Sequence, residues 1–225
     1  GYNPTVRAQL VAMSAATKPA ALMRNSITVR KAGDEVEDEP GFFETDTVAH
    51  CGPTLQGEFA RTLTMTDVLT GWVQLEVLRN NAQVHVLAGL DRAAAAIPYA
   101  IAGLDCDNGS EFINHEVMHW AADRLIFFTR SRPYQKNDQA TVESKNNHAV
   151  RKFGFHYRYD TDDERAILAA LWQVVGLKLN YFTATKKPTG WTHDASGRRK
   201  RVYDEPKTPY HRLLDSGILS TAQRG

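Results

Sequence analysis

Three carboxylates in this sequence have the types and positions that a metal-dependent reaction needs. Asp46 lies in a run typical of a strand, Asp107 follows an apolar run, and Glu143 lies in a segment of helix-forming composition. If the two strands are neighbours, both aspartates reach one edge of the sheet, and a helix packed there presents Glu143. Three converging carboxylates repel one another unless cations lie between them. We therefore expect Mg²⁺ or Mn²⁺, which prefer oxygen ligands and keep positions open for water and phosphate.

The position of Asp107 has a second explanation. Residues 97–104 read IPYAIAGL and are followed by Asp105, Asp107 and an Asn-Gly pair. Asn-Gly favours turns and acidic residues often cap helices, so a turn alone would explain these carboxylates. Asp105 is also an alternative metal ligand. Other carboxylates fit turn, cap or surface positions with at most a supporting role: Asp67, Glu111 and Asp138.

The hydrophobic pattern predicts the elements that would position these residues. Runs rich in Thr, Val, Phe and Leu predict an antiparallel meander, and a helical crossover then leads to a buried strand. The expected elements are strands at 42–50, 61–68 and 71–78, a helix at 82–96, a strand at 97–104, a helix at 115–123, a strand at 124–129 and a helix at 140–154.

A long helix is predicted after these elements. Thr161 and Glu164 have the spacing of a capping box, which marks a helix start. One face of this helix is expected to be apolar and to pack on the core: Ile167, Leu168, Leu171, Trp172, Val175 and Leu179.

Composition bounds the class of protein. The 225 residues are 42% hydrophobic, enough for one sizeable core, and 27 basic residues nearly balance 26 acidic ones. Two cysteines are too few for a disulfide framework. No apolar run approaches the ~20 residues of a membrane span. We expect a soluble cytoplasmic protein without membrane partners.

The chain is expected to have four parts. We predict an N-terminal arm or linker at 1–40, a catalytic core at 41–160, its long helix at 161–183, and a basic segment at 184–225, in which residues 185–202 have little to bury.

Several short motifs resemble a known family. ETD at 44–46, DNGSEF at 107–112 and VESKN at 142–146, with thirty-five residues between Asp107 and Glu143, resemble the Asp-Asp-Glu core of retroviral integrases and bacterial insertion-sequence transposases. TDVLTGWVQ at 66–74 and SRPYQKNDQATVESKN at 131–146 are similar to the bacterial branch in particular.

The resemblance implies a ribonuclease-H-like α/β fold, with a mixed five-stranded sheet flanked by helices. It implies that Asp46, Asp107 and Glu143 are the catalytic ligands of two Mg²⁺ or Mn²⁺ ions. The implied activity is cleavage at the ends of mobile-element DNA and strand transfer into target DNA, by a homo-oligomer assembled on double-stranded DNA and acting at the bacterial nucleoid.

Basic side chains around this core are candidates for DNA contacts, with an ordinary solvated surface as the alternative. Those in the loop before Glu143 are Arg130, Arg132 and Lys136, with Tyr134 placed to stack on a base. Those that continue along the helix are Lys145, Asn147 and Arg151. Those in the basic segment are Arg198, Arg199, Lys200 and Arg201, and this segment is also expected to bridge subunits.

Two rival functions remain open at this point. One is a non-catalytic DNA-binding descendant of a transposase. The other is a zinc hydrolase, because His115, Glu116 and His119 match the H-E-x-x-H pattern on a short helix. The identity of the bound metal would separate these possibilities.

Overall fold

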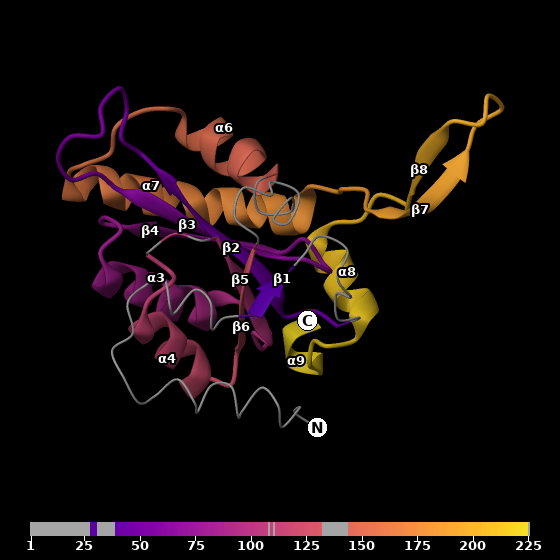
Figure 1. Ribbon diagram of the computed structural model, residues 1–225, viewed down its shortest axis with the longest axis horizontal. Coiled ribbons are helices and arrows are strands. Elements are labelled where there is room, and N and C mark those ends of the chain that lie inside the picture. The colour runs from indigo at the N-terminus through magenta and orange to yellow at the C-terminus, as the bar shows by residue number, and fades with distance from the viewer. Residues whose placement is uncertain (1–27, 31–38, 108, 110, 132–143, 225) are drawn as a thin grey trace.

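The computed structural model describes residues 28–30, 39–107, 109, 111–131 and 144–224, and its centre is a mixed sheet (Figure 1). The six strands of this sheet lie in the order β1-β6-β5-β2-β3-β4. They are β1 (Thr28–Arg30), β2 (Phe42–Ala49), β3 (Arg61–Asp67), β4 (Val73–Leu78), β5 (Gly103–Cys106) and β6 (Phe127–Ser131). The meander β2-β3-β4 is antiparallel, whereas β5 is parallel to both β2 and β6.

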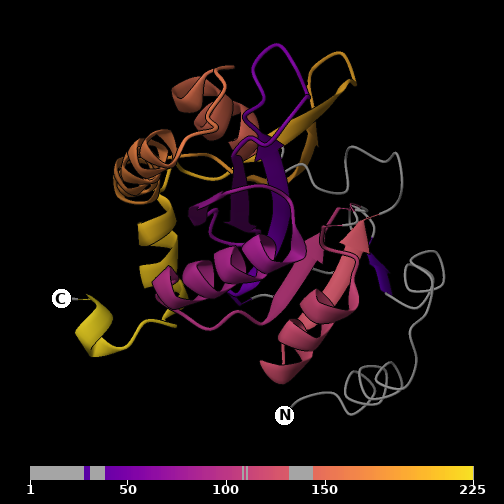
Figure 2. The same cartoon turned by 90° about the vertical axis from the view of Figure 1, so that its left-hand side faces the viewer.

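Helices cover both faces of the sheet (Figures 1 and 2). One face carries α3 (Gln83–Ala96) and α4 (His115–Asp123). The other carries the π-helix η2 (Asn146–Arg151), α6 (Lys152–Gly154), α7 (Asp162–Leu177) and the π-helical extension η3 (Lys178–Phe182). Each layer encloses its own buried cluster of apolar side chains.

The alternation of side chains along β2 decides where Asp46 points. Phe43 is buried in the cluster under α3 and α4, and Val48 is buried in the cluster under η2 and α7. Because successive strand residues point to opposite faces, Asp46 shares the face of Val48. The first aspartate therefore lies under the helices that follow Glu143 in the sequence.

Two boundaries differ from the sequence predictions. The strand expected at 97–104 begins only at Gly103, since Pro98 has no amide hydrogen for a sheet ladder and the preceding chain forms a loop. At Gly103 the ring of Phe42 occupies the space of a side chain, 2.3 Å from where a Cβ would lie. The predicted arm at 1–40 contributes a sixth strand, β1, which pairs with β6.

The predicted long helix is confirmed, but the prediction that Ile167 lies on its buried face is wrong. Thr161 and Glu164 form the predicted capping box. Leu168 and Trp172 are buried against the sheet, whereas Ile167 is 67% exposed. Ile167 lies about 100° around the helix from Leu168, because each residue turns the helix by that angle.

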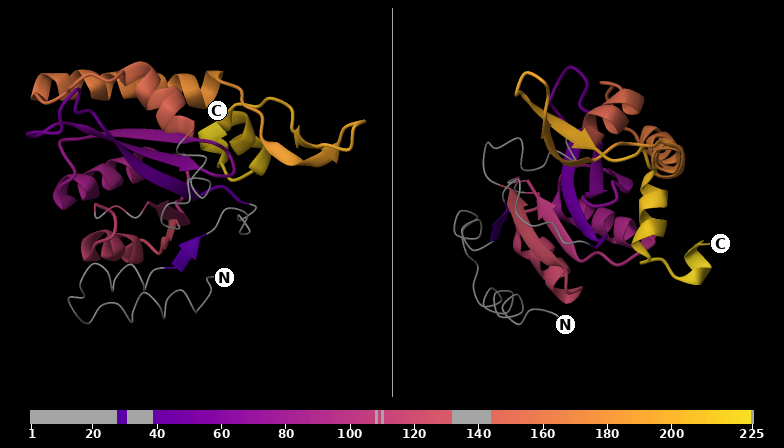
Figure 3. Two further views of the ribbon diagram at one scale, coloured as in Figure 1. Left: turned by 45° about the horizontal axis from the view of Figure 1, so that its top comes forward. Right: turned by 90° about the vertical axis from the view of Figure 1, so that its right-hand side faces the viewer.

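The segment 184–225 has two parts with different surroundings (Figure 3). Strands β7 (Pro188–His193) and β8 (Arg199–Tyr203) form a separate two-stranded hairpin that projects from the rest of the molecule. The following helices, α8 (Pro209–Ser216) and α9 (Thr221–Arg224), return to the core, where Leu213 and Leu219 are buried. The lack of buried apolar side chains expected of residues 185–202 therefore does not extend to this second part, which packs on the core.

Among the described residues, no helix has both the length and the apolar character needed to cross a bilayer.

Candidate active site

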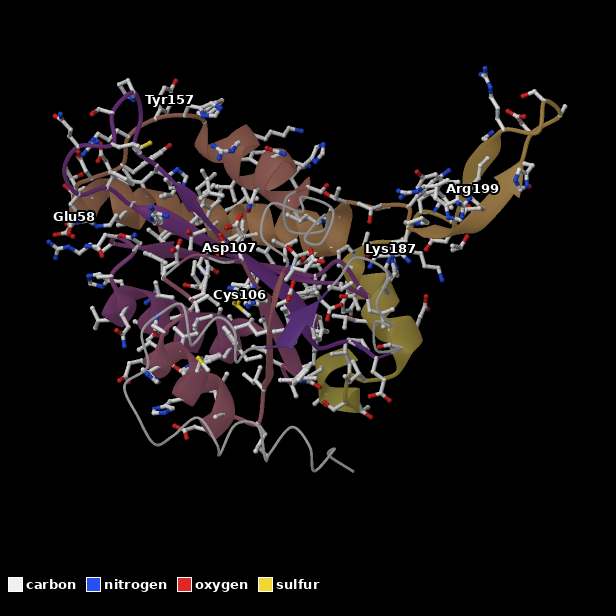
Figure 4. All side chains as sticks on the ribbon, viewed as in Figure 1. Glu58, Cys106, Asp107, Tyr157, Lys187 and Arg199 are labelled. Carbon is white, nitrogen blue, oxygen red and sulfur yellow. The ribbon has the colours of Figure 1, made fainter. Side chains whose placement is uncertain are left out.

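The two predicted aspartates come from neighbouring parallel strands. In the register of β2 and β5, Thr45 lies opposite Cys106, so the next residues along the two chains are Asp46 and Asp107. Figure 4 shows Asp107 beside Cys106 at the middle of the sheet. The carboxylates, 61 positions apart in the sequence, are thus brought to one place by the pairing of the strands.

The two carboxylates influence each other electrostatically. Burial, followed by the negative charge of Asp107, raises the pKa of Asp46 to about 6. The Thr47 amide and the Asn146 side chain oppose this rise, because both donate hydrogen bonds that stabilise the charged form. A half-buried pair of like charges is a setting in which bound cations stabilise both carboxylates, and oxygen donors suit Mg²⁺ or Mn²⁺.

Asp46 is held by direct hydrogen bonds. Nδ2 of Asn146, the first residue of η2, donates to Oδ2 of Asp46 over 2.7 Å. The Thr47 amide donates to Oδ1 over 2.7 Å. Both oxygens of the carboxylate are therefore oriented by donors from different elements, which fixes the side chain at the strand.

A second chain of contacts connects this carboxylate to the surrounding sheet. The Thr47 hydroxyl donates to Oε1 of Glu111 over 3.2 Å and accepts from Nη1 of Arg61 over 3.1 Å. Arg61 also pairs with Glu111 at 3.6 Å. Glu111 raises the pKa of Asp46 further through its charge. Arg61 therefore neutralises part of the negative charge that gathers beside the site.

Asp107 and its alternative, Asp105, differ in surroundings. Asp107 is half-buried just after β5, and its Oδ1 accepts from the Gly109 amide over 2.9 Å. Asp105 is fully buried, and its Oδ1 accepts from the Thr129 hydroxyl over 2.7 Å. Because a metal ion that binds substrate must remain accessible, these positions favour Asp107 as the ligand.

Glu143 lies outside the described residues, as do Arg132, Tyr134 and Lys136. Within the described part of the chain, no group of three or more histidine, cysteine, aspartate or glutamate side chains could hold a metal ion. The described site is therefore a pair of carboxylates with its hydrogen-bonding partners.

The predicted DNA-contact residues differ in exposure. Arg130 is only 8% exposed, which leaves little of its guanidinium for contact with a phosphate. Lys145 is half-buried, and burial lowers its pKa. Asn147 and Arg151 are exposed on η2. The four basic residues of the hairpin are all exposed: Arg198, Arg199, Lys200 and Arg201.

The hairpin carries an ordered group of cationic and aromatic side chains. Trp191 is 49% exposed and lies opposite Arg201 in the strand pairing. The guanidinium carbons of Arg199 and Arg201 lie 4.1 Å and 5.1 Å from the Trp191 ring centre. Figure 4 shows Arg199 on this projecting part of the chain.

The base of the hairpin is tied to the sheet. The Asp204 amide donates to the Lys187 carbonyl over 2.9 Å, and the Lys187 ammonium donates to the carbonyls of Val68 and Leu69. Burial lowers the pKa of Lys187 to about 8.

The H-E-x-x-H histidines lie on α4, on the opposite face of the sheet from Asp46. The ring centres of His115 and His119 are 6.2 Å apart. Nε2 of His115 is buried without a hydrogen-bond partner. Since the described residues contain no third ligand beside this pair, the structure gives the zinc interpretation no support there.

Sequence reasoning missed three residues that surround Asp46: Asn146, Thr47 and Arg61. The sequence held a signal for Asn146, because it follows Glu143 by three positions in a segment of helical composition. Residues at i and i+3 share a helix face, so Asn146 could have been predicted to lie at the site. Thr47 and Arg61 had no comparable signal, since their contact depends on the pairing of β2 with β3.

Comparison with known proteins agrees with the motifs. Residues 37–136 match the family model described as Integrase core domain. The chain is 36% identical over 193 residues to the uncharacterized protein y4rM of Sinorhizobium fredii. That match covers 86% of this chain but only 55% of the relative, so the chain spans about half of the relative's length.

Solved structures show the same fold. A chain of the simian T-cell lymphotropic virus intasome in complex with PP2A regulatory subunit B56 gamma matches 87% of this chain and 82% of its own length, with a TM-score of 0.54 and 16% identity. The magnesium complex of the HTLV-2 integrase catalytic core domain in its dimeric form matches 67% of this chain and 93% of its own length, with a TM-score of 0.50 and 13% identity. The predicted ribonuclease-H-like fold is confirmed.

Proposed function

Because residues 37–136 match the Integrase core domain model, we propose that this protein is a DNA transposase that cuts at the ends of a mobile element and joins them to target DNA. The observation that supports this most directly is that Asp46 and Asp107 directly follow Thr45 and Cys106, the last paired residues of the neighbouring parallel strands β2 and β5. The pKa of about 6 at Asp46 reflects burial beside a like charge, an arrangement that costs stability and is common at functional sites.

We propose that Asp46, Asp107 and Glu143 hold two Mg²⁺ or Mn²⁺ ions. The oxygen donors of the described pair fit these ions, and the magnesium complex of the HTLV-2 core domain is consistent with the choice of metal. Bound ions of this kind activate a water or hydroxyl nucleophile and stabilise the leaving oxygen in phosphoryl transfer.

The chain's own residues have separate tasks in this proposal. Asn146 and the Thr47 amide orient the two oxygens of Asp46, so that this carboxylate is preorganised before DNA binds. Arg61 limits the negative charge beside the site through its contacts with Thr47 and Glu111. These contacts lower the repulsion that an approaching phosphodiester meets.

DNA is proposed to contact two exposed regions. On η2 the contacts are Asn147 and Arg151, with Lys145 at their edge, and they continue the track proposed for Arg132, Tyr134 and Lys136. On the hairpin the contacts are Arg198, Arg199, Lys200 and Arg201. A two-stranded ribbon fits the ~12 Å major groove, and the basic residues would neutralise phosphates there. We further propose a homo-oligomer on DNA, at the bacterial nucleoid.

The experiment that tests this function uses duplexes that carry candidate element ends. The full chain is incubated with them and a supercoiled target in Mg²⁺, Mn²⁺ or EDTA, and the DNA is resolved on denaturing gels. Metal-dependent nicks followed by joined products are expected. Binding to the ends without any nicking in either metal would support the rival, a non-catalytic DNA-binding descendant.

A further inference from the structure

Aromatic side chains alternate along the chain through and beyond α6. They occupy every second position: Phe153, Phe155, Tyr157 and Tyr159. Phe153 and Tyr159 pack against the buried cluster under η2 and α7, whereas Phe155 and Tyr157 are 57% and 64% exposed. The two exposed residues, which we call the aromatic pair, have ring centres 5.5 Å apart and ring planes inclined at 45°. The core therefore uses two of these rings and leaves the other two on the surface.

The backbone at Phe155 is strained. Its φ of 54° and ψ of −160° lie in a region that is essentially confined to glycine. Among the described residues one other non-glycine residue has a positive φ, Leu125, which directly follows the C-cap of α4, where left-handed residues commonly end helices. A large ring at Phe155 costs the fold conformational energy, and its exposure returns little burial. A residue that opposes folding in both ways indicates a task outside folding.

The chain that carries the aromatic pair is held in place on both sides. The guanidinium of Arg158 donates four hydrogen bonds of 2.8 to 3.1 Å to main-chain carbonyls of the loop 51–58. The Tyr159 amide donates to the His50 carbonyl over 3.2 Å, and its hydroxyl donates to the Gly154 carbonyl over 3.0 Å. The aromatic pair is therefore preorganised, which lowers the entropy lost when a ligand binds.

The aromatic pair lies at the far end of a helix that starts at the active site. Asn146, which donates to Asp46, begins η2, and α6 continues this helix. Figure 4 shows Tyr157 at the edge of the molecule, with Asp107 at the middle of the sheet. At about 1.5 Å per residue, the helix from Asn146 to Phe155 spans about 13 Å, the length of about four nucleotides at about 3.4 Å each.

The side chains between these two ends favour an anionic ligand. The sequence from Asn146 to Tyr157 contains Arg151 and Lys152 but no aspartate or glutamate. Both basic residues are exposed. Exposed rings beside basic side chains are the combination that binds single-stranded nucleic acid, because cations contact the phosphates and bases stack on the rings.

We propose that Phe155 and Tyr157 form a stacking site for unpaired bases of the bound DNA, about four nucleotides from the phosphate at Asp46 and Asp107. A base inside a duplex is covered by its neighbours, so it stacks on these rings only after its base pair has opened. The inference rests on the proposed function for the identity of the DNA. It deepens that function by assigning a site for a locally opened strand.

The principal test measures the affinity of the full chain for a fluorescein-labelled single strand of about twelve thymidines, in EDTA, by fluorescence anisotropy. Phe155→Gly and Tyr157→Leu are each expected to weaken this binding about tenfold. Leu125→Gly is the matched control, because Leu125 is 56% exposed, has a φ of 57° and follows α4 on the opposite face of the sheet. This control should bind like the wild type. Unchanged affinity in both ring variants would overturn the proposal.

Thermal unfolding separates a stacking role from a structural one. Glycine relieves the backbone at position 155, so the melting temperature of Phe155→Gly should equal or exceed that of the wild type. A lower melting temperature together with unchanged affinity for the single strand would assign the ring to folding instead.

Two further measurements identify what contacts the aromatic pair. A strand that carries 5-iodouracil should cross-link to Phe155 or Tyr157 on irradiation, and cross-links at other residues alone would contradict the proposal. Hydroxyl-radical footprinting without DNA should oxidise both rings. If they are already protected, another segment or a partner protein covers them and the inference is wrong.

Cleavage assays keep this inference distinct from the proposed function. A mismatch at about the fourth base pair from the cut should reduce the cleavage defect of Phe155→Gly, since the base is then already unpaired. Normal nicking by both ring variants on a fully paired element end would overturn the inference alone. Binding of the single strand through these rings without any nicking would overturn the proposed transposase and leave the stacking site standing.

Discussion

The carboxylate pair and the β7–β8 hairpin are both proposed to meet DNA, yet their surroundings are opposite. Asp46 is half-buried, with both oxygens held by hydrogen bonds and its pKa raised to about 6. Every residue of the two hairpin strands is exposed. Burial makes the properties of a group depend on its neighbours, whereas an exposed group keeps the properties of its residue type. Mutations should therefore have large, specific effects at the pair and small, additive effects at the hairpin.

The largest effect is expected for Asp107→Asn. The amide keeps the shape of the side chain but loses the charge that binds a cation, so we expect cleavage to fall by more than about a thousandfold. DNA affinity, measured by gel shift, should change little. Asp123→Asn, an exposed aspartate at the end of α4, is the control and should cleave normally. Undiminished nicking by Asp107→Asn would sink the assignment.

The next largest effect is expected on the stability of the folded protein. It compares a buried histidine, His50, with an exposed one as the pH is changed. Burial, then the charge of Arg151, lowers the pKa of His50 from 6.5 to about 4. Between about pH 4 and pH 6.5, the unfolded chain therefore binds more protons at His50 than the folded protein does. The contribution of His50 to the free energy of unfolding is therefore fully present above about pH 6.5. It is lost as the pH falls toward 4, and the total loss is about 3 kcal/mol.

Urea unfolding at pH 7 and pH 5 checks this expectation. The drop in stability between the two pH values should be smaller in His50→Gln than in the wild type. His193→Gln, on the exposed hairpin, should behave like the wild type. If all three proteins lose the same unfolding free energy between pH 7 and pH 5, His50 is not the source of the pH dependence.

A smaller effect on catalysis is expected for Asn146→Ala, which removes the donor to Oδ2 of Asp46. Cleavage should fall by about tenfold to a hundredfold, as for other residues that orient a metal ligand. Because this hydrogen bond lowers the pKa of Asp46, its removal should also move the acidic limb of the pH–rate profile to higher pH. A lower rate with an unmoved profile would point to a structural role alone.

The smallest effect is expected at the hairpin. The double variant Arg199→Ala, Arg201→Ala should weaken binding to all duplexes and reduce the log–log salt slope by about 1.8, or about 0.9 for each phosphate that is no longer neutralised. Arg124→Ala is a matched control, because the guanidinium carbon of Arg124 lies 4.7 Å from the ring centre of Trp120 on α4, in a similar cation–aromatic contact. An unchanged slope in the double variant would make the hairpin an ordinary solvated surface.

Excision of residues 189–202, with a short glycine linker, tests the proposed bridging of subunits. The Asp204–Lys187 backbone contact brings the two ends of this cut close together. The excised protein should keep its metal site but form fewer paired-end complexes in gel shifts. Removing all of 184–225 is less informative, because Leu213 and Leu219 belong to the core.

Local sequence was sufficient for the elements with strong local signals. Thr161 and Glu164 marked the start of α7, and runs of β-branched residues marked the meander, because capping and alternation act between residues that are close in the chain. The motifs around Asp46 and Asp107 identified the fold, which the comparisons confirmed.

Tertiary structure decided what depends on distant contacts. The sequence did not show that Asn146 would hold Asp46, that Arg130 would be buried, or that Leu213 would reach the core. It also grouped Ile167 with the core, because periodicity alone does not distinguish one broad apolar face from two. Each of these outcomes depends on strand pairing or helix packing between residues far apart in the chain. The sequence by itself therefore determined the candidate carboxylates and most of the elements from β2 to α7, whereas packing fixed their neighbours, exposure and charge state and added β1, the hairpin and the final helices.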